Sequence, residues 1–282
     1  MRLTLHTAPD PAVRARLFAM IDRYNDDATG RTEPVRHLSI PLRDAAGMVE
    51  GGLVGISYYD WLIVEMLFVP RELRGHGMGT QLMRAAEAVA AARGCRGVWL
   101  DTASEAAAQF YRRLGYRAFA ELADQPPGHA RRFLSRMEPR GGGTAGFAVL
   151  QARDAATVAV VRRALGEVGN ALMGTDPGRA TLAILAEDEA GAPQGGLWMQ
   201  ARWGWLFLDL FILEPAARRG GTGSRILALA EAEAQARGCV GVWLDSYGFQ
   251  APEFYRRHGY QVIGTLPNYP APHGRYFLAK RF

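Results

Sequence analysis

The feature that most constrains this chain is an internal repeat marked by two similar glycine-rich turns. The turns lie 144 residues apart and read Arg74-Gly75-His76-Gly77-Met78-Gly79 and Arg218-Arg219-Gly220-Gly221-Thr222-Gly223. With that shift the halves align without a gap from about residue 38 to residue 138, and 93–101 agrees with 237–245 at eight of nine positions. A repeat of this length is a whole domain and not a solenoid unit. The sequence therefore predicts two tandem domains, 1–140 and 145–282, joined by the glycine-rich stretch 139–144.

Each half has the same predicted order: a starting strand, a helix, a hairpin, a third strand, the glycine turn, a helix, a strand, a short helix and two last strands. The ranges that define this order best are the strands 3–7 and 147–152, the helices 13–24 and 157–172, the third strands 61–69 and 205–213, and the helices 79–92 and 223–237. Hairpins first and a β-α-β arrangement later predict an α+β fold, with a mixed, largely antiparallel β-sheet flanked by helices in each domain.

The composition is that of an ordinary soluble globular protein, with 49% hydrophobic and 22% charged residues. The net charge of +5 contains no polybasic run, which suits an anionic cofactor and argues against nucleic acid as a partner. No apolar stretch approaches the roughly twenty residues of a membrane span and no secretory signal is recognisable, so we expect a cytoplasmic protein without membrane contact. The single lysine, Lys280, among many arginines indicates a GC-rich bacterial genome. Cys95 and Cys239 occupy equivalent places and are predicted to be buried thiols, and no metal site is expected.

The glycine turns have the chemistry of a phosphate cradle. Glycine lets the backbone approach a ligand closely, and the start of a helix offers unpaired N–H groups and the positive end of the helix dipole. A dinucleotide-binding fold would need G-x-G-x-x-G directly after the first strand of a parallel unit, and a P-loop would need Gly-Lys-Ser/Thr. Neither pattern is present, so the turns match neither of these two phosphate-binding motifs.

A strand, Arg-x-x-Gly-x-Gly, a helix, a strand and Phe-Tyr-x-x-x-Gly-Tyr follow one another in both halves, and this order resembles the GNAT superfamily of N-acetyltransferases. The resemblance implies acetyl-CoA (coenzyme A) as the cofactor. The implied phosphate-binding residues are Arg74, Gly75, His76, Gly77, Met78 and Gly79 in the first half, and Arg218, Arg219, Gly220, Gly221, Thr222 and Gly223 in the second. The implied backbone partners of the pantetheine arm are Leu67, Phe68 and Val69, and Phe211, Ile212 and Leu213.

Acetyl transfer to an amine needs a base for the ammonium proton and an acid for the leaving thiolate. The resemblance implies Tyr111 and Tyr255 as the acid. Glu65 and Asp209 are the candidate bases, because strand alternation predicts them on the face of Leu67 and Val69 and apolar neighbours would raise their pKa. The alternative for either carboxylate is pairing with an arginine. For Asp101 and Asp245, capping of the following turn is the better interpretation.

The resemblance places the acceptor between the first helix and the final hairpin, which nominates Tyr24 and Asn25 in the first half and Asn170 in the second. The expected function is acetyl-CoA-dependent N-acetylation of a primary amine, that of a small molecule, by direct attack on the thioester. Two alternatives stay open. One is a protein or peptide N-acetyltransferase, and the other is a tandem protein with one catalytically inactive acyl-CoA-binding copy.

Overall fold

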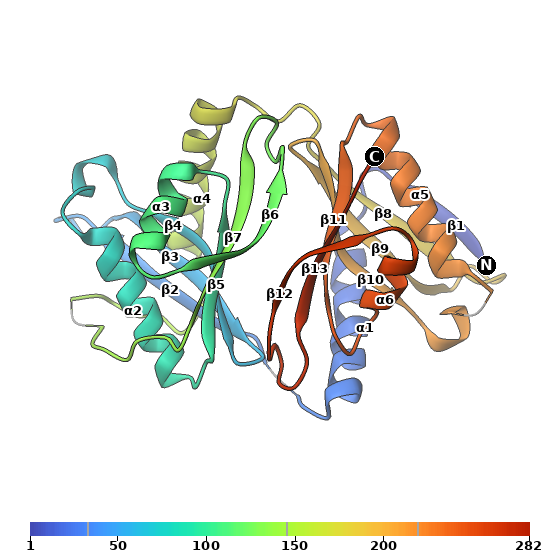
Figure 1. Ribbon diagram of the computed structural model, residues 1–282, viewed down its shortest axis with the longest axis horizontal. Coiled ribbons are helices and arrows are strands. Elements are labelled where there is room, and N and C mark those ends of the chain that lie inside the picture. Colours follow the sequence, from blue (N-terminus) through green and yellow to red (C-terminus); the bar gives the residue numbers. More distant parts are fainter. Residues whose placement is uncertain (33, 145, 219) are drawn as a thin grey trace. The chain divides into compact units, whose positions relative to one another are not determined.

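Two β-sheets with helices against their faces make up the part of the chain described by the computed structural model, residues 1–32, 34–144, 146–218 and 220–282 (Figure 1). Contacts between Cα atoms divide these residues into two units. Unit 1 contains 1–32, 122–130 and 176–282, and unit 2 contains 34–121 and 131–175. The α+β class is confirmed, and each unit is described by itself below.

Unit 2 is built on a sheet that has six strands within the described residues. In sheet order these are β2 (Arg36–Arg43), β3 (Val49–Tyr58), β4 (Trp61–Phe68), β5 (Gly97–Thr102), β7 (Ala130–Met137) and β6 (Arg117–Ala123). β4 pairs with β5 in parallel, whereas β2–β3, β3–β4 and β5–β7 are antiparallel. Its helical elements are η1 (Arg71–Leu73), α2 (Met78–Ala92), α3 (Glu105–Arg113) and α4 (Ala155–Met173). The mixed, largely antiparallel sheet is the one that the order of elements predicts.

Unit 1 repeats this plan with one strand more among the residues described. In sheet order its strands are β1 (Arg2–His6), β8 (Ala180–Glu187), β9 (Pro193–Arg202), β10 (Trp205–Leu213), β11 (Gly241–Tyr247), β13 (Arg275–Arg281) and β12 (Gln261–Leu266). Its helical elements are α1 (Pro11–Thr29), η2 (Pro215–Arg218), α5 (Thr222–Ala236) and α6 (Pro252–Arg257). No helix within the described ranges combines the length and the hydropathy that crossing a bilayer requires.

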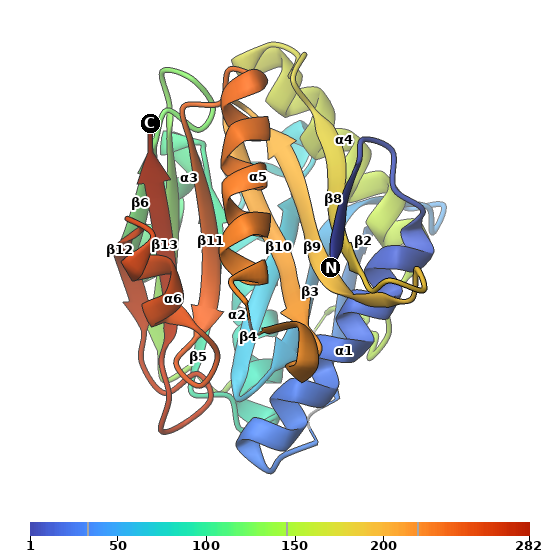
Figure 2. The same ribbon diagram turned by 90° about the vertical axis from the view of Figure 1, so that its right-hand side faces the viewer.

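Helices α5 and α1 cover opposite faces of the unit 1 sheet. Neighbouring side chains of a strand point to opposite faces. Ile184 packs in the cluster that includes Ile226 of α5, whereas Ala183 packs with Leu17 of α1. Figure 2 shows α5 lying along β10 and β11. The site described below is therefore formed on a sheet with a helix on each face.

The first helix of each sequence copy packs against the sheet of the other copy. In unit 1, β1 pairs with β8, and α1 lies against β9 and β10 (Figure 1). In unit 2, α4 of the second copy packs against β2, β3 and β4. The two arrangements correspond at the 144-residue shift: His6 pairs with Ala183, and Leu150 pairs with Ser39. The units therefore cross the linear boundary that the repeat suggests, since each takes its first helix from the other copy.

The predicted strand 147–152 is reduced, among the described residues, to that one bridge between Ser39 and Leu150. The helices that follow have matching starts. Asp10 caps α1 by accepting from the Ala12 N–H at 2.8 Å, and Asp154 caps α4 by accepting from the Thr157 N–H at 2.8 Å. Both caps lie at the same position of the repeat, so local sequence sets the helices and tertiary packing sets the sheet that each one covers.

The exchanged packing predicts that a substitution in the first copy destabilises the second copy's sheet. Leu17 of α1 is 1% exposed and packs against Trp198, Leu210 and Ile212. Leu17→Ala should lower the free energy of unfolding of unit 1 by about 2–5 kcal/mol, because it removes buried methyl groups and leaves a cavity. Hydrogen exchange should then accelerate in β9 and β10. The matched control is Val161→Ala at the equivalent position of α4, which should accelerate exchange in β3 and β4 instead; the reverse pattern would contradict the exchange.

Candidate active site

The acidic residue of the third strand is the extra residue of a β-bulge in both units. In β10, Leu208 faces Met199 and Leu210 faces Trp198, which leaves Asp209 without an opposite residue. In β4, the shift falls between Val64 and Met66, at Glu65. A bulge interrupts strict alternation. In both units the third strand therefore changes its pairing register with the preceding strand at the acidic residue.

This bulge makes the predicted facing of the two acids wrong. Alternation would place Asp209 on the face of Phe211, but Phe211 packs against the core under α5, whereas Asp209 binds Arg14 of α1 on the opposite face. In unit 2, Leu67 packs against the core that includes α2, whereas Glu65 binds Arg153, just before α4. The carboxylates therefore face the exchanged segments and not the glycine-turn helices.

Beyond the bulge, β10 and β11 stop pairing. Their parallel ladder runs from Trp205–Gly241 to Leu208–Leu244, and the ladder of β4 with β5 ends likewise at Ile63–Trp99. The rest of each third strand stays paired only on its other side among the described residues. Its open edge carries the predicted pantetheine partners: Leu67, Phe68 and Val69, and Phe211, Ile212 and Leu213. An extended ligand arm can bind such an edge as an added strand.

The glycine turns present uncapped helix starts. Gly77 and Gly221 are the N-caps of α2 and α5, with φ of 79° and 74°, in the left-handed region that favours glycine. Within the described residues no side chain caps the first-turn N–H groups of either helix. A Cβ added at Gly221 would meet no atom within 4 Å. The backbone donors are therefore open to an anion, and the turns fit the phosphates of coenzyme A.

The other residues of the turns differ in how they contribute. Gly75, His76 and Gly220 are exposed beside these open donors, and Arg219 lies outside the described residues. Thr222 is buried, and Met78 packs against the unit 2 core.

Two further sets of turn residues support the cradle by internal contacts. Arg74 and Arg218 donate from Nε to the carbonyls of Val69 and Leu213, each at 2.9 Å, which ties the turn to the end of the third strand. Gly79 and Gly223 face aromatic rings: an added Cβ would lie 3.2 Å from Phe110 and 3.6 Å from Phe254, respectively. Their small size permits close packing of the short helix that carries the candidate tyrosine.

A pocket of about 360 Å³ lies in unit 1 where these parts meet. Asp209 and the open edge of β10 line it on one side, Tyr255 on another, and Arg218 and Gly223 at the glycine turn. Tyr24 of α1 completes the lining. The candidate acid, the candidate base and the predicted cofactor-binding elements of the second copy thus share one cavity.

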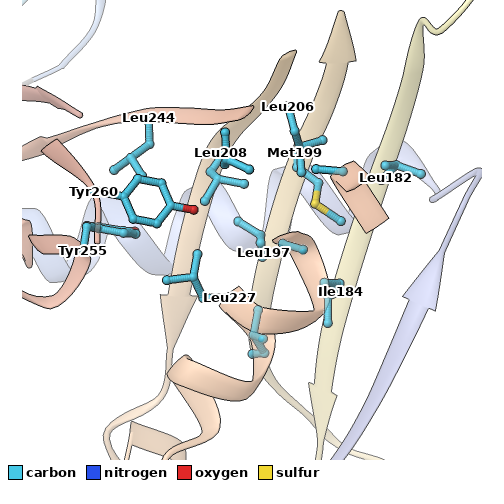
Figure 3. Packing of buried hydrophobic residues seen from close by; sticks show 14 of the residues in the cluster. Leu182, Ile184, Leu197, Met199, Leu206, Leu208, Leu227, Leu244, Tyr255 and Tyr260 are labelled. Atoms are coloured by element: carbon cyan, nitrogen blue, oxygen red, sulfur yellow. The ribbon is translucent and has the colours of Figure 1, made fainter. Parts of the chain in front are cut away.

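Tyr255 is buried in a position that raises the pKa of its hydroxyl. It is 7% exposed and contacts the rings of Phe254 and Tyr260, and Figure 3 shows it beside Tyr260 at the end of the core. Burial, and to a lesser extent the charge of Asp245, raises the pKa of its hydroxyl well above the usual value. Tyr111 has the same environment in unit 2, where burial and Asp101 raise its pKa. Each hydroxyl stays protonated near neutral pH, as a proton donor must.

The two candidate bases differ in exposure. Asp209 pairs with Arg14 at 3.0 Å and its side chain is 17% exposed. Burial raises the pKa of Asp209, and the charge and hydrogen bond of Arg14 oppose this rise. Glu65 pairs with Arg153 at 2.6 Å and its side chain is 29% exposed. Both carboxylates thus have an arginine partner from the exchanged segment, and Asp209 is the more desolvated of the two.

Asp101 and Asp245 do not cap the turns that follow them, contrary to the sequence interpretation. They form ion pairs of 2.7 Å with Arg131 and Arg275, two arginines of the last strand at equivalent positions. The cap of α3 is Ser104, whose hydroxyl accepts from the Ala107 N–H at 3.3 Å. The strand pairing brings the last strand beside these aspartates, which the linear spacing does not reveal.

The exchange of helices also corrects the predicted acceptor residues. Tyr24 and Asn25 were expected in the first copy's site, but α1 carries them into unit 1, beside the second copy's pocket. Asn170 lies on α4 in unit 2 and is exposed. The two copies would be equally similar in sequence whichever sheet each first helix covered. The repeat therefore could not show which site Tyr24, Asn25 or Asn170 approaches.

Sequence reasoning did not identify Arg14, Arg153 or Gln250. The two arginines lie near the start of each exchanged helix, and nothing local marks them as partners of the strand acids. Gln250 did have a signal, because it lies in Tyr247-Gly248-Phe249-Gln250-Ala251-Pro252, where the repeat breaks down against Ala103–Ala108. Such a departure within an otherwise close repeat is a place where the copies can differ in function.

Comparison with known proteins identifies one family domain in each sequence copy. The sequence model described as the acetyltransferase (GNAT) domain matches residues 42–118 and 179–262. Blasticidin-S acetyltransferase of Streptomyces morookaense is 40% identical over 99 residues, which cover 35% of this chain and 73% of that protein. Acetyltransferase Atu2258 of Agrobacterium fabrum is 35% identical over 127 residues, 45% of this chain and 89% of that protein. A crystal structure of a putative acetyltransferase from Agrobacterium tumefaciens covers 49% of this chain and 99% of its own, with 31% identity and a TM-score of 0.47.

Proposed function

This chain belongs to the GNAT acetyltransferase family and uses acetyl-CoA, and from this premise we propose that it acetylates the primary amine of a small molecule at the unit 1 pocket. The observation that carries the proposal is the shared cavity: Asp209, Tyr255 and the open edge of β10 line the same space of about 360 Å³. Base, acid and donor site are then within one cavity, as proton transfer coupled to acyl transfer requires.

Acetyl-CoA supplies an acetyl group activated as a thioester, which the amine attacks directly. The first-turn N–H groups of α5 would hold its phosphates, and the β10 edge at Phe211–Leu213 its pantetheine arm. Asp209 takes the ammonium proton, directly or through one water, and Arg14 orients this carboxylate and opposes the rise in its pKa that burial causes. Tyr255 keeps its proton because burial raises its pKa, and gives that proton to the departing sulfur.

Two observations support a small acceptor. The volume of the pocket falls in the range of sites for small ligands. One relative is named for acetylating blasticidin S, a small molecule. A protein or peptide acceptor is the alternative, and it would be recognised over a larger surface than this pocket offers.

A second candidate function applies to unit 2, which we propose binds acyl-CoA without transferring the acetyl group. It retains a glycine turn with uncapped donors and an open edge of β4. Its carboxylate Glu65 is the more exposed of the two and is held by Arg153. The cradle would persist there while the acceptor side has diverged.

A panel of amines with a free-thiol readout tests the proposal. We expect thiol release from acetyl-CoA with at least one class of small primary amine, and none with peptides that carry a free N-terminus or lysine. Controls without amine measure hydrolysis. Acetylation of peptides alone would favour the alternative acceptor, and thiol release with neither class would overturn amine acetylation.

A further inference from the structure

The segment before α6 is an open loop in unit 1 and a helical turn in unit 2. α3 begins at Glu105, but α6 begins only at Pro252, which corresponds to Ala108. Proline is favoured in the first turn of a helix and disfavours the helical conformation of the residue before it. Unit 2 instead has alanines, which favour helix, at the corresponding positions. Residues 248–251 of unit 1 are therefore a loop, and Gln250 and Ala251 of this loop line the pocket.

The side chain of Gln250 joins this loop to α1. Its Nε2 donates to Asn25 Oδ1 at 2.8 Å, and its Oε1 accepts from the Tyr247 N–H at 3.0 Å. Asn25 is only 4% exposed, so its end of this hydrogen bond is shielded from water. A half-buried amide that makes both bonds holds the loop against the helix, because leaving either group unpaired costs free energy.

Tyr24 also joins α1 to this loop. Tyr24 Oη donates to the Phe249 carbonyl at 3.2 Å, while the Tyr24 ring lies 4.9 Å from the Arg218 guanidinium. One turn of α1 thus contacts both the loop before Tyr255 and the arginine of the glycine turn. Both contacts cross from the first sequence copy to the second within unit 1.

The other copy cannot make these contacts. The positions that correspond to Tyr24, Asn25 and Gln250 are Val168, Gly169 and Ala106. None of these side chains has a hydrogen-bonding group. The copies therefore differ in the contacts that their exchanged helix makes with the segment before the tyrosine, while both have an uncapped glycine turn.

Resting on the proposed function, we propose that Asn25 and Gln250 are a positioning pair that holds the loop 248–251 as the acceptor wall of the unit 1 site. The pair acts through the loop, and within the described ranges neither side chain has a hydrogen bond to the glycine turn. The first sequence copy thereby completes the acceptor side of the second copy's site, and the equivalent wall of unit 2 lacks this support.

Single and double variants of the full chain test the pair. Asn25→Ala and Gln250→Ala should each raise KM for the amine roughly tenfold. This is the effect of losing one hydrogen bond and leaving the other side chain's group unpaired. The Kd for acetyl-CoA should not change, since the cradle is untouched. The double variant should be no worse than the poorer single one, because both substitutions break the same link. Gln235→Ala, which removes an exposed amide from the last turn of α5, is the matched control and should leave the amine KM unchanged.

Hydrogen exchange gives a readout that does not depend on turnover. In Asn25→Ala, the peptide covering 246–251 should exchange at least about tenfold faster, with no change in α5. Unchanged exchange there, or additive effects in the double variant, would overturn the positioning pair. If the wild-type protein releases no thiol with any amine but the loop still loosens, the proposed function fails while the pair stands. Loosening throughout unit 1 would instead mean that the pair stabilises the fold and overturn a specific positioning role.

Discussion

Replacing Tyr255 with phenylalanine should slow acetyl transfer by roughly 10²–10⁴-fold, the range for losing a general acid. The substitution removes one buried hydroxyl and keeps the ring between Phe254 and Tyr260, so folding should persist. Acetyl-CoA affinity should stay the same, because the turn and the β10 edge are unaltered. Steady-state thiol release and calorimetric titration measure the two quantities separately.

Tyr111→Phe is the matched control, and it should leave turnover near the wild-type level if unit 2 binds without transfer. A fall to about half in each variant would mean that both copies transfer acetyl groups. An unchanged kcat in Tyr255→Phe would exclude this hydroxyl as the acid. The pH profile is a further check: burial raises the pKa of Tyr255 above its usual value near 10, so deprotonation of this group should not lower kcat below about pH 9.

Replacing Gly221 with valine should abolish acetyl-CoA binding in unit 1. The backbone there has φ of 74°, which a β-branched residue adopts only at a cost of about 1–3 kcal/mol. The new side chain would also project into the open space above the first-turn N–H groups, where an added Cβ meets no atom within 4 Å. We expect a rise in Kd of at least roughly 100-fold by calorimetry.

Gly77→Val makes the same change in unit 2, where φ is 79°, and should remove binding from that unit alone. Each variant should therefore retain one of two sites, and the titrated stoichiometry should fall accordingly. Loss of both sites in either variant would show that the copies do not bind independently. Thermal unfolding of the two variants separates a damaged cradle from a damaged fold.

Much of the donor side could be predicted from the sequence because it rests on local backbone chemistry. Each glycine turn, at Gly77 or Gly221, is contiguous in the chain with the strand before it and the helix after it. Their spacing predicts a cradle without knowledge of any distant contact, and the structure places these parts as expected. The tyrosines follow at a constant distance in each copy, so their place in the short helices could be predicted as well.

The acceptor side was predicted less well, because it depends on contacts between distant segments. The bulge at Asp209 and Glu65 arises from pairing with a neighbouring strand, and it turns both carboxylates away from the predicted face. Arg14 and Asp209 are 195 positions apart in the chain, and Asn25 and Gln250 are 225 apart. No spacing rule or propensity reports pairs of this kind.

The sequence by itself determined the repeat, the α+β class, the glycine turns at the starts of α2 and α5, and the place of one tyrosine in the short helix of each copy. Only the tertiary structure decided which sheet each first helix covers, and hence which residues face Asp209 and Tyr255. The physical reason is that helix caps and apolar periodicity are satisfied equally on either sheet. The choice between the sheets is made by packing, as at Leu17 against Trp198 and Leu210, and by part-buried hydrogen bonds such as that of Asn25 with Gln250.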